Sequence, residues 1–144
     1  MTPAAQLEGF LARYDPAIAR QGRAALRTLR KLLPGAVELV YDNYNALVIA
    51  FSKSERAGDI VLSIALYPRW LTLFFMHGAK LKDPTKRLQG SGSKIRGVRL
   101  ADAGDLDDGD VVALIEQASA TARFGKRALI IKAIVKKQRP RRPK

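Results

Sequence analysis

The sequence contains no cysteine and a single histidine, His77. Without a thiolate the chain has no cysteine nucleophile, disulfide, cysteine-ligated zinc or iron–sulfur cluster, and one histidine excludes a site built on two histidine ligands. No apolar run approaches the roughly 18 residues of a membrane span. The first basic residue is Arg13, so the N-terminus lacks the charged and apolar regions of a secretory signal. We therefore expect a cytoplasmic protein without a transmembrane segment.

Negative charge is also scarce, because 13 Asp and Glu face 26 Lys and Arg, for a net charge of +13. Residues 1–122 carry a net charge of only +3, whereas residues 123–144 carry ten basic side chains and no acid. This split predicts one domain over residues 1–122, followed by a basic C-terminal helix and a disordered tail over 123–144. The tail cations with which we expect nucleic acid to interact are Lys126, Arg127, Lys132, Lys136, Lys137, Arg139, Arg141 and Arg142.

The apolar residues follow a helical period up to Pro34 and a period of two after it. Helices are predicted over residues 4–14 and 16–33. Short links join the first four predicted strands, so consecutive strands must pair as an antiparallel meander. Within Asp59–Tyr67, we expect Ile60, Leu62, Ile64 and Leu66 on one face and a softer face opposite. The predicted strands are Val37–Asp42, Ala46–Ser52, Asp59–Tyr67, Trp70–Met76 and a short one near Val98–Leu100.

Two further helices are predicted towards the C-terminus. One begins at an acidic cluster that includes Asp105 and Asp110 and buries Val111 and Leu114. The last, Ala122–Lys137, carries a broad apolar stripe. The expected fold class is therefore α+β: an antiparallel β-meander of about five strands, covered by N-terminal and C-terminal helices as an α/β sandwich.

Four arginines, Arg20, Arg23, Arg27 and Arg30, share one face of the second predicted helix. We favour a solvated helix surface over a binding stripe. The acids Asp105, Asp107 and Glu116 are spaced like calcium ligands, but Gly109 and Asp110 break that pattern, and helix capping explains them. We predict no metal site, no cofactor and no catalytic residue.

Residues 77–99 contain seven basic residues and four glycines. His77 ends an apolar strand without a nearby activated nucleophile. The segment Gly90–Lys94 is similar to a phosphate-binding loop but lacks the helix that such a loop opens. Aromatic and amide side chains near Tyr41 and Trp70 suit the lining of a small ligand site. The ligand-binding hypothesis comprises Tyr41, Asn43, Tyr67, Arg69, Trp70, His77, Lys80, Lys94 and Arg96.

Two segments, VELVYDNYNALVIAFS and IALYPRWLTLFFMHGAKLKDPTKRLQGSGSKIRGVRL, carry a family resemblance. On them, Val37–Ala118 resembles the bacterial YdhG-like family of unknown function, which is placed near frataxin. The resemblance implies an α/β sandwich with a helix-covered antiparallel sheet. Some relatives are described as frataxin-like iron chaperones that use exposed helix carboxylates. The first helices here depart from that pattern, with Arg13, Arg20, Arg23, Arg27, Arg30 and Lys31 against Glu8 and Asp15.

These observations favour a non-enzymatic binding domain whose cationic tail and 80–99 loop engage an anionic partner, with nucleic acid first. Recognition would be largely independent of sequence. The alternatives are an iron chaperone, by family analogy, and a protein that binds a small anionic ligand. An enzyme using His77 or Tyr41, and a membrane-surface role for Ala128–Lys137, are further alternatives.

Overall fold

The computed structural model describes residues 1–43 and 45–134. The predicted tail, together with Lys136, Lys137, Arg139, Arg141 and Arg142, lies outside the described residues. In the part described, the helices and strands follow one another in the order that the sequence periods predict, apart from the last element. The helices are α1 (Pro3–Leu11), α2 (Pro16–Leu32) and α3 (Gly109–Ser119), with 3₁₀ turns at Ala57–Asp59, Gly78–Lys80 and Ala103–Asp107. The strands are β1 (Val37–Asp42), β2 (Leu47–Ser52), β3 (Ile60–Leu66), β4 (Leu71–Phe75), β5 (Arg96–Leu100) and β6 (Ala128–Ile134).

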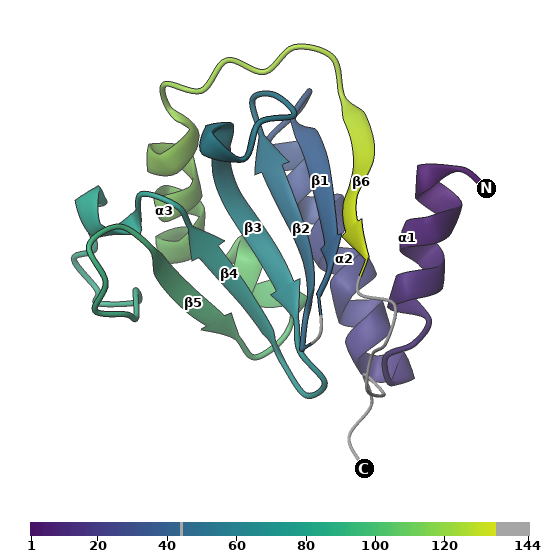
Figure 1. Cartoon of the computed structure of the whole chain (residues 1–144). Coiled ribbons are helices and arrows are strands. Elements are labelled where there is room, and N and C mark those ends of the chain that lie inside the picture. Colours follow the sequence, from purple (N-terminus) through teal and green to yellow (C-terminus); the bar gives the residue numbers. More distant parts are fainter. Residues whose placement is uncertain (44, 135–144) are drawn as a thin grey trace.

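The strands form one mixed sheet in the order β5-β4-β3-β2-β1-β6 (Figure 1). Strands β1 to β5 pair antiparallel with their chain neighbours, which confirms the meander. Strand β6 instead pairs parallel with β1. The chain is therefore an α+β protein whose sheet has one strand more than the meander, and a mixed rather than a purely antiparallel topology.

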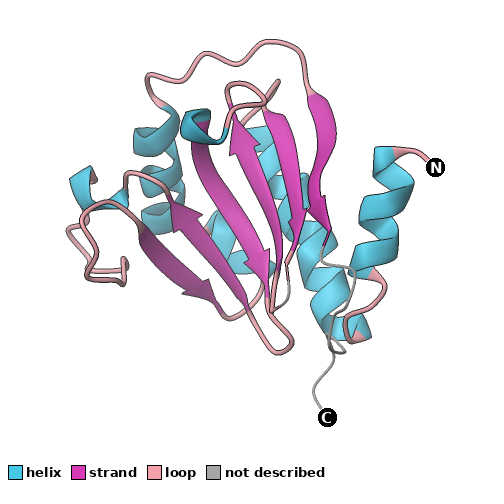
Figure 2. Ribbon diagram, viewed as in Figure 1, coloured by secondary structure: helices cyan, strands magenta, loops and turns pink. Residues whose placement is uncertain are grey.

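All three α-helices pack on one side of the sheet, which we call the helix face (Figure 2). Leu26 and Leu29 of α2 are buried against strand residues such as Ile49 and Ile64. The apolar residues recur at i, i+3 and i+4 in α2, so one stripe of this helix meets the sheet. The same core contains the buried side chains of α1 and α3.

The other side of the sheet, which we call the open face, carries a second and smaller cluster. Leu39 and Ala50 are buried there, packed against Tyr41, Met76 and Ile130. Strand residues alternate between the two faces, so these positions interleave with those of the helix face. No helix of the described residues contributes to this second cluster.

The predicted helix over Ala122–Lys137 is wrong, because residues Ala128–Ile134 form β6. Leu129 and Ile131 pack on the helix-face core, whereas Ile130 packs on the open face. That alternation has a period of two, and β-branched isoleucines favour strands. The basic C-terminal segment therefore begins as part of the sheet.

A bulge corrects the predicted faces of the third strand. Ser52 pairs with Ile60 while Phe51 pairs with Leu62, so Val61 is left without a partner on β2. As a result Ile60 belongs to the open-face cluster and Val61 to the helix-face core. Beyond the bulge, Leu62, Ile64 and Leu66 lie on the helix face as predicted.

Candidate functional site

The nine residues of the ligand-binding hypothesis lie at opposite ends of the sheet. Tyr41 and Asn43 lie at the end of β1, and Tyr67, Arg69 and Trp70 lie around the β3–β4 turn at that same end. His77, Lys80, Lys94 and Arg96 lie at the other end of β4, where Arg96 pairs with Phe75. Strand β4 has five residues at about 3.4 Å each, so the two groups are roughly 17 Å apart. They do not form a single small-molecule site.

His77 borders two pockets at its end of the sheet. One pocket of about 220 Å³ is also lined by Asp59 and Lys80. The other, of about 470 Å³, is lined by His77, Lys94, Ile60, Met76 and Ile95. Apolar side chains next to a histidine and a lysine suit a small ligand with an apolar body and a negative group.

Arg96 shapes the glycine-rich loop beside these pockets. Its Nη1 donates hydrogen bonds to the carbonyl oxygens of Gly92 (2.6 Å) and Ile95 (2.8 Å). The amide of Ala79 also donates to the carbonyl of Lys94 at 2.9 Å. The Arg96 guanidinium therefore holds the loop in shape, whereas the Lys94 side chain stays exposed.

At the other end of the sheet, the rings of Tyr67 and Trp70 stack with centroids 5.2 Å apart. The Arg99 guanidinium lies 4.1 Å from the Trp70 ring centroid, a cation–π contact. The amide of Tyr67 donates to the carbonyl of Trp70 and closes the turn that presents Arg69. Arg99 is not among the nine residues of the ligand-binding hypothesis, since only the pairing of β5 with β4 brings it to Trp70.

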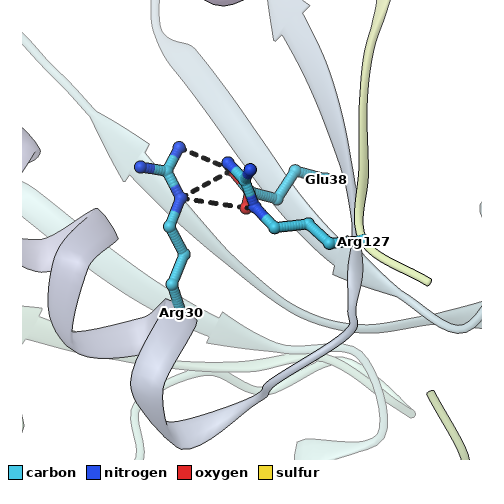
Figure 3. Close-up of polar contacts among 3 residues, drawn as sticks. All are labelled: Arg30, Glu38 and Arg127. Atoms are coloured by element: carbon cyan, nitrogen blue, oxygen red, sulfur yellow. Dashed lines mark hydrogen bonds and ion pairs between the residues drawn. The ribbon is translucent and has the colours of Figure 1, made fainter. Parts of the chain in front are cut away.

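The Arg127 side chain forms an ion pair with Glu38 inside the fold (Figure 3). The Glu38 side chain is 1% exposed. It accepts hydrogen bonds from Arg30 Nε (2.9 Å) and Nη2 (2.8 Å), and from Arg127 Nε (3.0 Å). Helix α2 and the residue just before β6 thus share one buried carboxylate. Of the expected nucleic-acid cations, this one already has an acidic partner within the fold.

The arginine stripe of α2 is only partly a solvated surface. Arg20 and Arg27 are exposed as predicted, but Arg23 pairs with Glu8 and Arg30 with Glu38. A pocket of about 290 Å³ opens between α1, α2 and β6, lined by Arg23, Arg27, Arg30, Arg127 and Glu8 among others.

The basic segment 77–99 also divides into paired and unpaired cations. Arg87 pairs with Asp108 at 3.3 Å. The Asp110 amide donates a hydrogen bond to Asp108, and this bond and the Arg87 contact lower the pKa of the Asp108 carboxyl. In the part of the chain that the structure describes, four exposed lysines of this segment have no acidic partner within 4.0 Å. These four are Lys80, Lys82, Lys86 and Lys94.

One member of the predicted acidic cluster caps α3, since the Asp108 side chain accepts a hydrogen bond from the Asp110 amide. Asp102, outside that cluster, caps the 3₁₀ turn Ala103–Asp107 by accepting from the Gly104 amide. Among residues 1–43 and 45–134, no three His, Asp or Glu side chains gather as a metal site would require. Within the same ranges no helix is long and apolar enough to cross a membrane.

Comparisons of the chain with protein-family models, curated proteins and solved structures find no match. The class that the fold defines is an α+β domain with helices on one sheet face.

Proposed function

We propose that this protein is a non-enzymatic binding domain whose basic surface engages polyanions, with nucleic acid as the favoured partner. The observation that carries the proposal is a group of exposed lysines that have no ion-pair partner among the described residues: Lys80, Lys82, Lys86 and Lys94, which we call the lysine loop. Six further Lys and Arg lie in residues 135–144 of the sequence. A cytoplasmic location is part of the same proposal.

Cations without partners favour polyanions because contact with phosphates releases condensed counterions. A cation already paired with a carboxylate, as Arg127 is with Glu38, gains less from such a contact, since the pair must first be broken. We therefore assign phosphate contacts to the lysine loop and to the residues 135–144, and not to Arg127. Binding of this kind reads the backbone and is largely independent of base sequence.

The test is the anisotropy of a fluorescently labelled 20-base-pair duplex, titrated with protein between 50 and 200 mM salt. The logarithm of the association constant should fall linearly with the logarithm of salt concentration, with a slope of about −0.9 for each phosphate contacted. The triple variant Lys80→Gln, Lys82→Gln, Lys94→Gln should make the slope less negative by up to about 2.7, three times the slope for one contact.

The matched control removes the same charge from the exposed positions Arg20, Arg27 and Lys31 of α2, each replaced by Gln. This control should leave the salt slope unchanged. Equal weakening by both triple variants would show that only net charge matters, and no binding at 50 mM salt would overturn the proposal.

A small anionic ligand is the second candidate, because His77 and Lys94 border a pocket of about 470 Å³. A ligand that binds only the folded state raises its melting temperature. Phosphate-bearing and carboxylate-bearing compounds should raise the melting temperature of the parent protein and not that of the variant Lys94→Gln. No shift with any of them would end this candidate.

We also propose membership of the YdhG-like family, supported by the α+β class and by the two sequence segments that carry the resemblance. Iron binding, which that resemblance implies for some relatives, is tested by calorimetric titration with Fe(II). Heat of binding with a defined stoichiometry would favour it, and its absence would exclude it.

A further inference from the structure

The open face of the sheet carries partly exposed aromatic side chains around a centre of small residues. Strand alternation and the helix-face positions of Leu73 and Val98 place Phe74 and Arg99 on the open face. Cross-strand pairing puts Ala50, Ser63 and Phe74 in one row. The next row contains Tyr41, Val48, Ala65, Thr72 and Arg99.

One edge of the Phe74 ring lies over Gly97 of β5. A β-carbon added to Gly97 would meet Phe74 Cδ1 and Cε1 at 3.1 Å. Glycine at this position therefore lets the ring lie across the neighbouring strand. The stacked rings of Tyr67 and Trp70 extend this aromatic surface, because Trp70 directly precedes β4, the strand that carries Phe74. All four rings, including that of Tyr41, are partly exposed.

The charged side chains that the described strands place on the open face are all basic. Within the described strands the only acidic residues are Glu38 and Asp42. Both are buried and bind arginines of the helical side, Arg30 and Arg13. The open face instead presents Arg99 beside Trp70, and the exposed Arg69 lies in the adjoining turn.

From this arrangement we infer that the open face binds single-stranded nucleic acid, whose bases stack on Tyr41, Phe74 and the Tyr67–Trp70 pair while Arg69 and Arg99 contact its phosphates. The inference rests on the proposed function and adds the kind of nucleic acid and the surface that binds it. Partly exposed rings with nearby cations are the combination that single-strand-binding surfaces use.

The dimensions of the face fit a short segment of single strand. Tyr41 on β1 and Arg99 on β5 are four strand spacings apart, or about 19 Å at about 4.8 Å per spacing. Bases in a duplex are stacked on each other, and only an unpaired strand can turn the flat side of a base onto a protein ring. The open face should therefore prefer single strands over duplexes, a preference that the lysine loop alone would not create.

The only tryptophan of the chain, Trp70, reports on this surface directly. The experiment titrates the full chain at 50 mM salt with three probes: a twelve-nucleotide oligo(dT), a duplex of equal length and long-chain polyphosphate, which has no bases. We expect oligo(dT) to quench the Trp70 emission, while polyphosphate and duplex bind with little change in it.

The variant Phe74→Leu keeps an apolar side chain but removes the aromatic ring. It should weaken oligo(dT) binding at least about fivefold, since stacking on one ring contributes a factor of roughly 5 to 150. Binding of duplex and polyphosphate should not change. Phe124→Leu alters a partly buried aromatic residue packed against the helix-face core and is the matched control, without effect on any of the three probes.

If Phe74→Leu impairs folding, Arg99→Gln tests the same face through an exposed side chain. This variant should also weaken the binding of oligo(dT) more than the binding of duplex. Equal binding of single and double strands, lost in the lysine-loop variant but not in Phe74→Leu, would overturn this inference and leave the proposed function standing. No binding of any probe would overturn both. Trp70 emission that depends on protein concentration without nucleic acid would show instead that a second copy occupies the face.

Discussion

The buried carboxylate of Glu38 gives the most quantitative prediction for stability. Arg30 donates two hydrogen bonds of 2.8–2.9 Å to it and Arg127 donates one of 3.0 Å. The Arg30 and Arg127 side chains are 32% and 49% exposed, whereas Glu38 is 1% exposed. Loss of a cation therefore leaves a carboxylate that water cannot reach, unlike the loss of a surface ion pair.

Stripping a buried charge of its partner costs about 3–5 kcal/mol. Arg30→Ala leaves Arg127 in place, so we expect about 3 kcal/mol, at the lower end of that range. Arg127→Ala removes one bond from a more exposed partner and should cost about 1.5 kcal/mol, the lower end of the range for a hydrogen bond to a charged group. The double variant should lose more than the sum, because each arginine compensates for loss of the other.

Urea unfolding followed by far-UV circular dichroism measures these differences as shifts of the midpoint at constant m-value. Arg20→Ala on the exposed surface of α2 is the control and should change the free energy of unfolding by less than about 0.5 kcal/mol. Losses below about 0.5 kcal/mol for both Arg30→Ala and Arg127→Ala would refute the buried-charge reasoning.

Three further predictions concern β6, a buried tyrosine and pH. Truncation after Ala122 removes β6 with Arg127, and it should lower the free energy of unfolding by more than Arg127→Ala does. Equal stability of the truncated protein and the Arg127→Ala variant in urea titration would contradict the place of β6 in the sheet. Tyr14, 1% exposed, donates to the Leu66 carbonyl at 2.9 Å, so Tyr14→Phe should cost about 1–2 kcal/mol, and an unchanged urea midpoint would count against this bond. The pKa of Asp108 is lowered below its ordinary value of 3.8, so the stability that the ionised carboxylate contributes is present above that pH and lost on acidification. The variant Asp108→Asn should therefore show a shallower fall of the urea midpoint with decreasing pH between pH 6 and 2. A fall as steep as that of the parent protein would contradict this prediction.

The meander could be predicted from sequence because its determinants are local. Val37–Asp42 is a strand with the predicted bounds, and turns such as the one at Arg69 leave no room for a crossover helix. Strand β6 was missed because an apolar run of this length suits either a helix or a strand. Its pairing with β1 depends on residues about 90 positions away in the chain.

The candidate site shows the same division between local and long-range information. The sequence indicated Tyr41, Tyr67 and Trp70, since their residue types are informative without a fold. It did not reveal that Arg99 lies over Trp70, because that contact follows from the β4–β5 register. Nor did charge counting reveal that Glu38, far from Arg127 in the sequence but on the neighbouring strand β1, pairs with it.

The emission of Trp70 during a salt titration of the complex with oligo(dT) tests base stacking on the open face and phosphate contacts by the basic residues together. Stacking should quench the emission at 50 mM salt, and the release of phosphate contacts should restore it as salt is raised past about 200 mM. Emission that oligo(dT) leaves unchanged at 50 mM salt would contradict the account.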